Sequence, residues 1–387
     1  MDKLIWDLIP DTPTTLQPMF CPNSQCKNFH DPPEDRSSWI YRYGFYQTKC
    51  FGKVPRFRCR DCRRTFSTQT FSIDYYAKCR ADYIQILKNL AIGGGLGDLV
   101  RLTGLREETV QNRIDRMSRA CLAISSELRE QIPFEEDFVL DGFESFAGSQ
   151  YYPNNINILV GSKTEMIHGM GLSVLRRKGR MTEDQKKKRE VLEQKEVADP
   201  KDTHKSVASL MKDLCANLKA KQIDHRLLYT DEHGAYPQSI KMAGDAATIL
   251  EHHQISSRKP RSTSNQLFPV NYVDRQFRKD LANHHRETVQ YSRCPQAMMS
   301  RLTVYQLYHN YISPQRVRRF RRGDKSGRGL AAGLSIDRIR QVMRDHWGRR
   351  PFIAKTSLWE EERKTWLQKW RNPGVKFGRY IPKYAAA

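Results

Sequence analysis

Three acidic residues stand at places in this 387-residue chain where a carboxylate is unusual. Asp141 interrupts the apolar run VLDGF, Asp231 ends the run LLYTD, and Asp274 lies in FPVNYVDRQFRKDL, within a strongly basic stretch. Burying a carboxylate in an apolar strand is costly unless a cation or hydrogen bonds compensate. Carboxylates are preferred ligands of Mg²⁺, and two such ions about 3.5–4 Å apart can serve phosphodiester hydrolysis or transfer. Asp141 and Asp231 are therefore candidate metal ligands, the alternatives being a strand-end surface residue and a turn-forming aspartate.

Four cysteines form a second constellation, in the short pairs Cys21/Cys26 and Cys59/Cys62. Both spacings allow two thiolates to bind one tetrahedral Zn²⁺, and a four-thiolate site is structural because it leaves no position for water. The aromatic and β-branched residues between the pairs predict two strands and a turn. We therefore expect residues 15–72 to form a zinc ribbon, with Cys50 and His30 as substitute ligands and buried apolar cysteines as the alternative.

The ribbon is rich in arginine, with Phe57 and Phe66 interleaved. This composition suits contact with DNA phosphates more than catalysis. The residues expected to bind DNA there are Arg56, Arg58, Arg60, Arg63 and Arg64.

Residues 80–128 carry the pattern of a helix-turn-helix DNA-binding domain. Leu99, Val100 and Leu102 predict a short helix that Asp98 could cap, and Gly104 suits a tight turn. A longer helix is expected from Glu107 to Ala120, and in this motif the second helix enters the major groove. The residues expected near base edges or phosphates are Thr109, Gln111, Asn112 and Arg113. An ordinary helical hairpin between two domains is the alternative.

The elements that must position the carboxylates follow Pro133. Apolar runs predict strands at 137–146, 155–162 and 166–177, followed by a charged helical excursion at about 180–202. An amphipathic helix at 204–220 and a strand that ends at Asp231 come next. This order is that of a ribonuclease H-like core, expected at 134–312, with α/β architecture and a mixed sheet. In that core the first acidic residue lies on the first strand and the second ends the fourth, as Asp141 and Asp231 do.

Composition supports a nucleic-acid partner. Sixty-six Lys and Arg against 43 Asp and Glu give a net charge of +23, and such a field attracts polyanions. No apolar run approaches the roughly 20 residues of a membrane-spanning helix. The acidic N-terminus does not read as a secretory signal, and the odd number of cysteines indicates reduced thiols. We expect a cytoplasmic, nucleoid-associated protein.

Four stretches together resemble bacterial or archaeal insertion-sequence transposases of the DDE superfamily, the kind with an N-terminal zinc ribbon and helix-turn-helix. They are RFRCRDCRRTFS, VLDGFESF, LLYTDEHGAY and NYVDRQFRKDL, and the resemblance runs from about Cys21 to about Leu334. It implies cleavage and strand transfer of double-stranded DNA, at the terminal inverted repeats of the element and at a target. It also implies Asp141, Asp231 and Asp274 as catalytic ligands of Mg²⁺ or Mn²⁺.

The chain departs from the family pattern at the third acid, which is usually Glu and here is Asp274. Moving the alignment by one helical turn would place Asn271 there instead, a weaker and uncharged ligand. Arg278, four residues after Asp274, is expected on the same helix edge, within reach of a DNA phosphate.

Residues 313–387 form a basic C-terminal region with two expected helices. Its stretch YISPQRVRRFRRGDKSGRG is either a solvated linker or a segment that clamps DNA. Four tryptophans, Trp347, Trp359, Trp366 and Trp370, are expected to pack against the core or a second subunit.

The expected assembly is a homodimer or higher oligomer on DNA, because a transposase must hold two DNA ends. Two alternative functions are a catalytically idle, sequence-specific DNA-binding regulator and a ribonuclease H-like nuclease or junction resolvase without joining activity.

Overall fold

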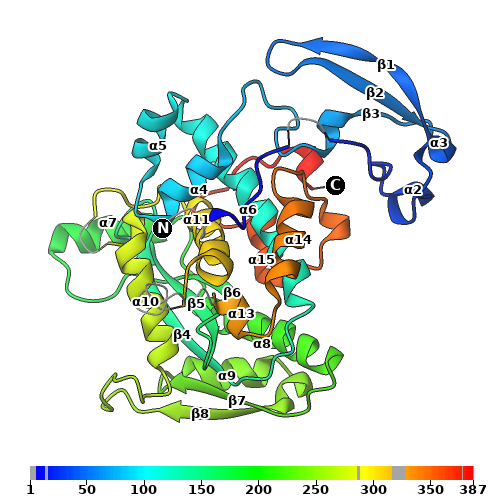
Figure 1. The fold of residues 1–387 in the computed structure, drawn as a ribbon. Helices are drawn as coiled ribbons and strands as arrows, with labels where there is room; N and C mark the ends of the chain where they lie inside the picture. Colours follow the sequence, from blue (N-terminus) through cyan, green and yellow to red (C-terminus); the bar gives the residue numbers. More distant parts are fainter. Residues whose placement is uncertain (1–5, 14–15, 286–287, 316–326, 377, 387) are drawn as a thin grey trace.

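The N-terminal cysteines lie in a three-stranded antiparallel sheet of order β1-β2-β3. This computed structural model describes residues 6–13, 16–285, 288–315, 327–376 and 378–386, without the side chains of 245 and 246. The sheet projects from the rest of the chain (Figure 1). The two strands expected between the cysteine pairs are confirmed, and β3 is an addition. The bounds are β1 (Ile40–Thr48), β2 (Gly52–Cys59), β3 (Thr65–Ser67), α2 (Lys27–His30), α3 (Arg36–Trp39) and η1 (Thr68–Phe71).

Three helices follow: α4 (Tyr83–Ala91), α5 (Leu96–Thr103) and α6 (Glu107–Arg129). At the start of α5, Asp98 accepts a hydrogen bond from the Gly95 amide at 2.7 Å, which caps the helix as expected. Gly104 ends α5 with a φ of 67°, a conformation that glycine adopts at little cost. The longer helix is also confirmed, but α6 continues to Arg129 and is buried along most of its length.

The second sheet has five strands in the order β6-β5-β4-β7-β8. β4 pairs antiparallel with β5 and parallel with β7, β5 pairs antiparallel with β6, and β7 pairs parallel with β8. The sheet is therefore mixed, as expected. Its bounds are β4 (Phe138–Phe146), β5 (Pro153–Gly161), β6 (Ile167–Val174), β7 (Arg226–Asp231) and β8 (Leu250–Ile255).

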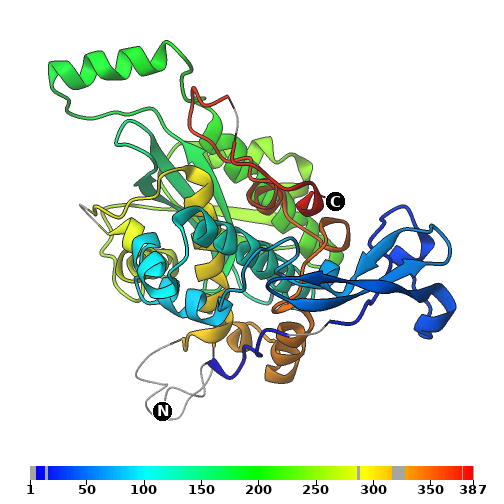
Figure 2. The same ribbon diagram turned by 90° about the horizontal axis from the view of Figure 1, so that it is seen from above.

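The remaining elements between β6 and the C-terminal region surround this sheet (Figures 1 and 2). The charged excursion is a helix, α7, without a buried residue, and it projects from the molecule in Figure 2. The amphipathic helix α8 buries Val207, Leu210, Met211 and Leu214 as expected. The bounds are α7 (Glu183–Glu193), α8 (Asp202–Ala220), α9 (Ala235–Met242), η2 (Asp245–Ile249), α10 (Phe268–Asp280), η3 (Ala282–His284), α11 (Pro295–Leu307) and η4 (Tyr308–Ile312).

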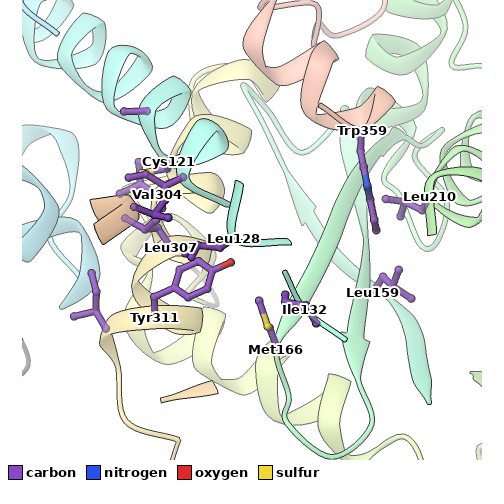
Figure 3. Packing of buried hydrophobic residues seen from close by; sticks show 14 of the residues in the cluster. Cys121, Leu128, Ile132, Leu159, Met166, Leu210, Val304, Leu307, Tyr311 and Trp359 are labelled. Carbon is purple, nitrogen blue, oxygen red and sulfur yellow. The ribbon is translucent and has the colours of Figure 1, made fainter. Parts of the chain in front are cut away.

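One hydrophobic cluster runs through the helices and the five-stranded sheet (Figure 3). Cys121 and Leu128 of α6 belong to it together with Val304 of α11, Leu159 of β5 and Leu210 of α8. The segment that contains α4 to α6 therefore shares its core with the sheet. Among the described helices, none is long and apolar enough to cross a membrane.

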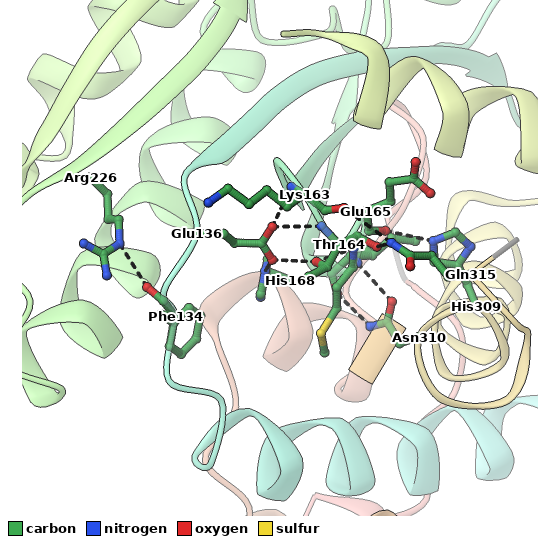
Figure 4. Close-up of polar contacts among 12 residues, drawn as sticks. Phe134, Glu136, Lys163, Thr164, Glu165, His168, Arg226, His309, Asn310 and Gln315 are labelled. Carbon is green, nitrogen blue, oxygen red and sulfur yellow. Dashed lines mark hydrogen bonds and ion pairs between the residues drawn. The ribbon is translucent and has the colours of Figure 1, made fainter. Parts of the chain in front are cut away.

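A buried polar network ties the turn between β5 and β6 to its neighbours (Figure 4). Glu136 accepts hydrogen bonds from the amides of Lys163 and Thr164 at 2.7 and 2.9 Å. Asn310 of η4 accepts from the Ile167 amide and donates to the Ile167 carbonyl, both at 2.9 Å. Asn310 thus satisfies the backbone polar groups at the start of β6.

The C-terminal region packs back onto the core. All four tryptophans named above are buried within the chain, which confirms the expected packing. Arg129 of α6 forms a buried ion pair with Glu362 at 2.6 Å. The basic segment 316–326 lies outside the described residues. The bounds are α13 (Arg328–Ala331), α14 (Ile336–His346), η5 (Ile353–Lys355), α15 (Glu360–Trp366) and η6 (Lys383–Ala385).

Candidate active site and metal centre

The sheet brings the first two aspartates together. β4 and β7 are parallel neighbours, and Phe138 pairs with Leu228 and Val139 with Tyr229. Asp141 and Asp231 each lie two residues beyond the last pair, so they stand at the same level of adjacent strands, Asp141 within β4 and Asp231 at the carboxyl end of β7. Ligand sites in open α/β sheets form outside the carboxyl ends of parallel strands, where neighbouring strands separate.

Asp274 reaches the same region from α10. Val270, Val273 and Phe277 are fully buried on one face of this helix, and the Phe277 ring lies 5.6 Å from the ring of Phe143 on β4. Asp274 is half-buried, and its Oδ1 atom is buried without a hydrogen-bond partner among the described residues. A carboxylate oxygen in this state is costly unless a cation binds it.

The alternative ligand Asn271 is already engaged. Its side-chain amide donates to the Leu267 carbonyl one turn earlier, at 2.8 Å. This bond ties the side chain to its own helix. Of the two candidates for the third ligand, Asp274 is the one with a charged oxygen, and its Oδ1 is buried without a partner among the described residues.

The carboxylates act on one another electrostatically. Burial raises the pKa of Asp141 to about 6, and the negative charge of Asp231 adds to the rise. Burial raises the pKa of Asp274 to about 8, and the charge of Asp141 adds to that rise against the opposing fields of Arg278 and Arg275. Like charges that disfavour one another's ionised forms are typical of carboxylates that share a metal site.

Tyr236 is a site residue that sequence reasoning missed. Its hydroxyl donates to Asp141 Oδ1 at 3.3 Å, and the side chain is buried at the start of α9. Burial and then the charges of Asp141, Asp231 and Asp274 raise the pKa of Tyr236, so all three carboxylates act on this hydroxyl. The signal was present in TDEHGAY, where a tyrosine follows Asp231 on the next helix.

Asp231 is oriented by its own turn, since its Oδ1 accepts the His233 amide at 2.9 Å. The three aspartates do not bring one oxygen each within 4.8 Å of one another, as a group of four cysteines does elsewhere in the described residues. Carboxylate oxygens are the ligands that Mg²⁺ and Mn²⁺ prefer, and the Oδ1 atom of Asp274 has no other partner among the described residues. A cation between the three aspartates would also offset the repulsion among their negative charges.

The four predicted cysteines form the group that meets this distance criterion. The Sγ atoms of Cys21, Cys26, Cys59 and Cys62 all lie within 4.8 Å of one another. The Sγ atoms of Cys21 and Cys62 are 3.4 Å apart, and those of Cys26 and Cys59 are 3.8 Å apart. Tetrahedral Zn²⁺ with bonds of about 2.3 Å places its sulfur ligands roughly 3.8 Å apart, which is close to both distances. The thiols therefore fit a zinc-like ion.

The polar surroundings of the thiols are consistent with this fit. Asn28 donates to Cys59 Sγ at 3.5 Å. Without an ion, burial raises the pKa of Cys21 and of Cys26, whereas hydrogen bonds from the Arg64 backbone and neighbouring groups outweigh burial at Cys62 and lower its pKa to about 7. The substitute ligands Cys50 and His30 lie outside the group, and His30 bonds the Ser24 carbonyl instead.

One face of the ribbon sheet combines arginine with tyrosine. Tyr41 pairs with Arg58 across β1 and β2, and side chains of paired residues share a face. The guanidinium groups of Arg56 and Arg58 lie 5.5 and 5.4 Å from the ring centre of Tyr43, and that of Arg60 lies 5.3 Å from the Tyr41 ring. Arg60, Arg63 and Arg64 are exposed.

Two residues expected to read DNA from α6 are instead buried, which corrects that expectation. Gln111 donates to Asp115 at 3.0 Å, and Arg113 donates to the Cys79 carbonyl at 2.8 Å. α6 is enclosed by other helices, so its polar side chains satisfy one another inside the protein. Thr109 and Asn112 are half-buried.

Arg278 also has structural contacts. It donates to the carbonyls of His284 and Glu144, both at 3.0 Å, and its guanidinium lies 4.4 Å from the ring centre of Phe143. These contacts attach α10 to β4 beside Asp274.

Searches against protein-family models, curated proteins and solved structures found no match for this chain.

Proposed function

We propose that this protein is a DNA transposase of the DDE type with a ribonuclease H-like catalytic core. It binds the terminal inverted repeats of its element and catalyses cleavage and strand transfer. The observation that carries the proposal is that Asp141 and Asp231 lie at the same level of two adjacent parallel strands and, with Asp274, act on one another electrostatically, with pKa values raised for Asp141 and Asp274.

The order of elements supports the same assignment. Three strands, helices and a fourth strand that ends at Asp231 follow one another, and β4 and β7 are neighbours in the sheet. In this proposal the adjacent parallel strands β4 and β7 carry Asp141 and Asp231, and α10, which packs against β4, adds Asp274.

In this proposal Asp141, Asp231 and Asp274 hold Mg²⁺ or Mn²⁺. When bound, the ions supply Lewis-acid stabilisation of the attacking and leaving oxygens of a phosphodiester. Tyr236 fixes the orientation of the Asp141 carboxylate through its hydroxyl. The four cysteines hold a structural Zn²⁺.

Double-stranded DNA is the proposed partner, and the zinc ribbon is its first contact. The exposed Arg60, Arg63 and Arg64 meet phosphates, and the tyrosine rings hold Arg56 and Arg58 in place. A net charge of +23 favours this partner and a nucleoid-associated location. Because two DNA ends must be held, we propose a dimer or higher oligomer on DNA.

The test is a plasmid that carries the inverted repeats flanking the reading frame, incubated with Mg²⁺ and a target plasmid. The wild type is expected to nick at the repeat ends and join them to the target, and Asp231→Ala is expected to bind DNA without cutting it. Glu232→Gln is the matched control, because this neighbouring acid is exposed and is expected to leave cleavage unchanged.

Other results would reassign the protein. Binding without cleavage by the wild type would indicate an idle DNA-binding regulator. Cleavage without joining would indicate a nuclease.

A further inference from the structure

A cleft of about 400 Å³ opens between the helices α5, α6 and α11. Its walls come from the start of α5, the start of α6, residues 289–294 and one face of α11. None of the three site aspartates and none of the four cysteines lines it. The cleft is therefore separate from both centres described above.

Arg301 of α11 is the unusual residue in this cleft. Its side chain lines the cavity, and the residue is only 5% exposed. Its guanidinium forms no hydrogen bond and no ion pair within 4.0 Å with any residue that the structure describes, and its Nε atom is buried. Burial lowers the pKa of Arg301 to about 10, against the opposing fields of Cys294 and Glu107, so the group stays charged at neutral pH.

A buried charge without a partner is strongly unfavourable. Two of the other charged pairs at the cleft are closed: Asp98 bonds Arg101, and Arg379 lies 3.2 Å from Asp115. Glu107 and Glu108 also line the cleft, but neither approaches Arg301 to ion-pair distance among the described contacts. The guanidinium of Arg301 is therefore open to an anion that enters the cleft.

The start of α11 adds to this preference for an anion. Cys294 is the N-cap of this 13-residue helix and makes no side-chain hydrogen bond to the first turn, and both Cys294 and Ala297 line the cleft. Helix N-termini favour anions because their first amides lack intrahelical partners and the helix dipole is positive there. The helix end and Arg301 border the same cavity.

We propose that this cleft binds a phosphate group. The planar guanidinium of Arg301 offers paired N–H donors that match two phosphate oxygens, and the first turn of α11 offers amides. A phosphate of the DNA backbone and a free phosphate or nucleotide present the same chemistry. The assignment of a DNA-backbone phosphate to this cleft rests on the proposed function, whereas the phosphate site itself does not.

Inorganic phosphate is the first probe, titrated by calorimetry and thermal shift at constant ionic strength, with chloride as the reference anion. The wild type is expected to bind it saturably. Arg301→Met is expected to weaken binding at least tenfold without lowering the midpoint in phosphate-free buffer, since Met replaces an unpaired buried cation with an apolar chain of similar length. Arg344→Met, at an exposed position of α14, is the matched control and is expected to bind as the wild type does.

Glu107→Gln keeps Arg301 intact and so gives a second measurement. Removing this competing carboxylate is expected to tighten phosphate binding severalfold. The proposal is overturned if the wild type shows no saturable binding, if Arg301→Met binds phosphate as tightly as the wild type, or if Glu107→Gln has no effect.

The two sources are separated with duplex DNA and with adenosine monophosphate. Log affinity for the duplex falls with log salt, so its slope is negative. If a backbone phosphate occupies the cleft, Arg301→Met makes this slope less negative by about 0.9, the share of one phosphate. If a free phosphate or nucleotide occupies the cleft, the variant no longer binds adenosine monophosphate, and its affinity for the duplex is the same as that of the wild type. Neither measurement requires DNA cleavage, so failure of the transposase assay would leave the phosphate site standing.

Discussion

Asp274 illustrates how surroundings change a carboxyl group. In an exposed position it would ionise near pH 4. On α10 it is half-buried beside Asp141, and one of its oxygens has no partner among the described residues. The same features that make its ionised form unfavourable make it a good ligand once a cation arrives. Asn271, one turn earlier, lacks this property because its amide is uncharged, and its side-chain nitrogen donates to the Leu267 carbonyl.

The first residue-scale prediction separates these two candidates. Asp274→Asn is expected to lower the rate of Mg²⁺-dependent nicking by roughly 100-fold or more, because a charged metal ligand is lost. Asn271→Ala is expected to lower it by less than about tenfold, through helix packing alone. Nicking of supercoiled plasmid measures both. The opposite order of effects would assign the metal to Asn271.

The second residue-scale prediction concerns how the stability of the protein depends on pH. Asp141 and Asp274 have folded-state pKa values of about 6 and about 8, above their ordinary range. Their contribution to stability is therefore complete below about pH 4 and is lost as the pH rises through 6 and 8. In Mg²⁺-free buffer without a chelator, so that the thiols keep their ion, the unfolding midpoint is expected to fall over this range. Mg²⁺ should restore it increasingly with pH, because it binds the ionised forms.

Asp274→Asn provides the control for that titration. Without the ionisable group, the decline between about pH 6 and 8, to which Asp274 alone of the two contributes, should flatten. An unchanged slope in this variant would mean that other groups cause the decline. Differential scanning fluorimetry between pH 5 and 9 measures each case.

The N-terminal three-stranded sheet, the expected zinc ribbon, has two different faces. It carries the cysteine group at one end, and Trp39, Phe66 and Phe71 form a small core with the cysteines and with Phe352 of the C-terminal region. Tyr41 and Tyr43 hold arginines on the other face. Because so small a core is marginal by itself, the ribbon depends on the ion that the thiols bind.

Removing a thiol should therefore unfold the ribbon selectively. Cys59→Ser is expected to lose bound zinc and to make residues 15–72 sensitive to protease, while the five-stranded core stays intact. Zinc content by atomic emission and limited proteolysis with mass spectrometry measure these effects. Cys50→Ser, in the same ribbon but outside the group, should keep one zinc per chain. Equal zinc loss in both variants would contradict the assignment of the ligands.

At the scale of the whole molecule, the C-terminal region holds the helices and the sheet together. Arg129 of α6 bonds both carboxylate oxygens of Glu362, at 2.6 and 2.8 Å, and its guanidinium lies 4.5 Å from the ring centre of Trp359. Glu361 and Trp366 are buried beside this pair. The last part of the chain thus completes the core that the five-stranded sheet shares.

Breaking this pair should destabilise the molecule as a unit. Glu362→Gln is expected to lower the free energy of unfolding by roughly 3 kcal/mol, because it leaves Arg129 buried without a counter-charge. Urea denaturation monitored by tryptophan fluorescence measures the change. Glu360→Gln, at an exposed neighbouring position, should change it by less than about 0.5 kcal/mol. A transition that splits into two steps would show that the region unfolds separately.

The sequence by itself determined the local features: the four cysteines, the strands that carry Asp141 and Asp231, and helix α10 with Asp274. These follow from spacing and periodicity, which are properties of neighbouring residues. Tertiary structure decided the rest. It made β4 and β7 neighbours, brought Tyr236 to Asp141, and enclosed α6 so that Gln111 and Arg113 point into the protein. Burial and the charges of distant residues depend on which elements pack together, and no local pattern specifies that.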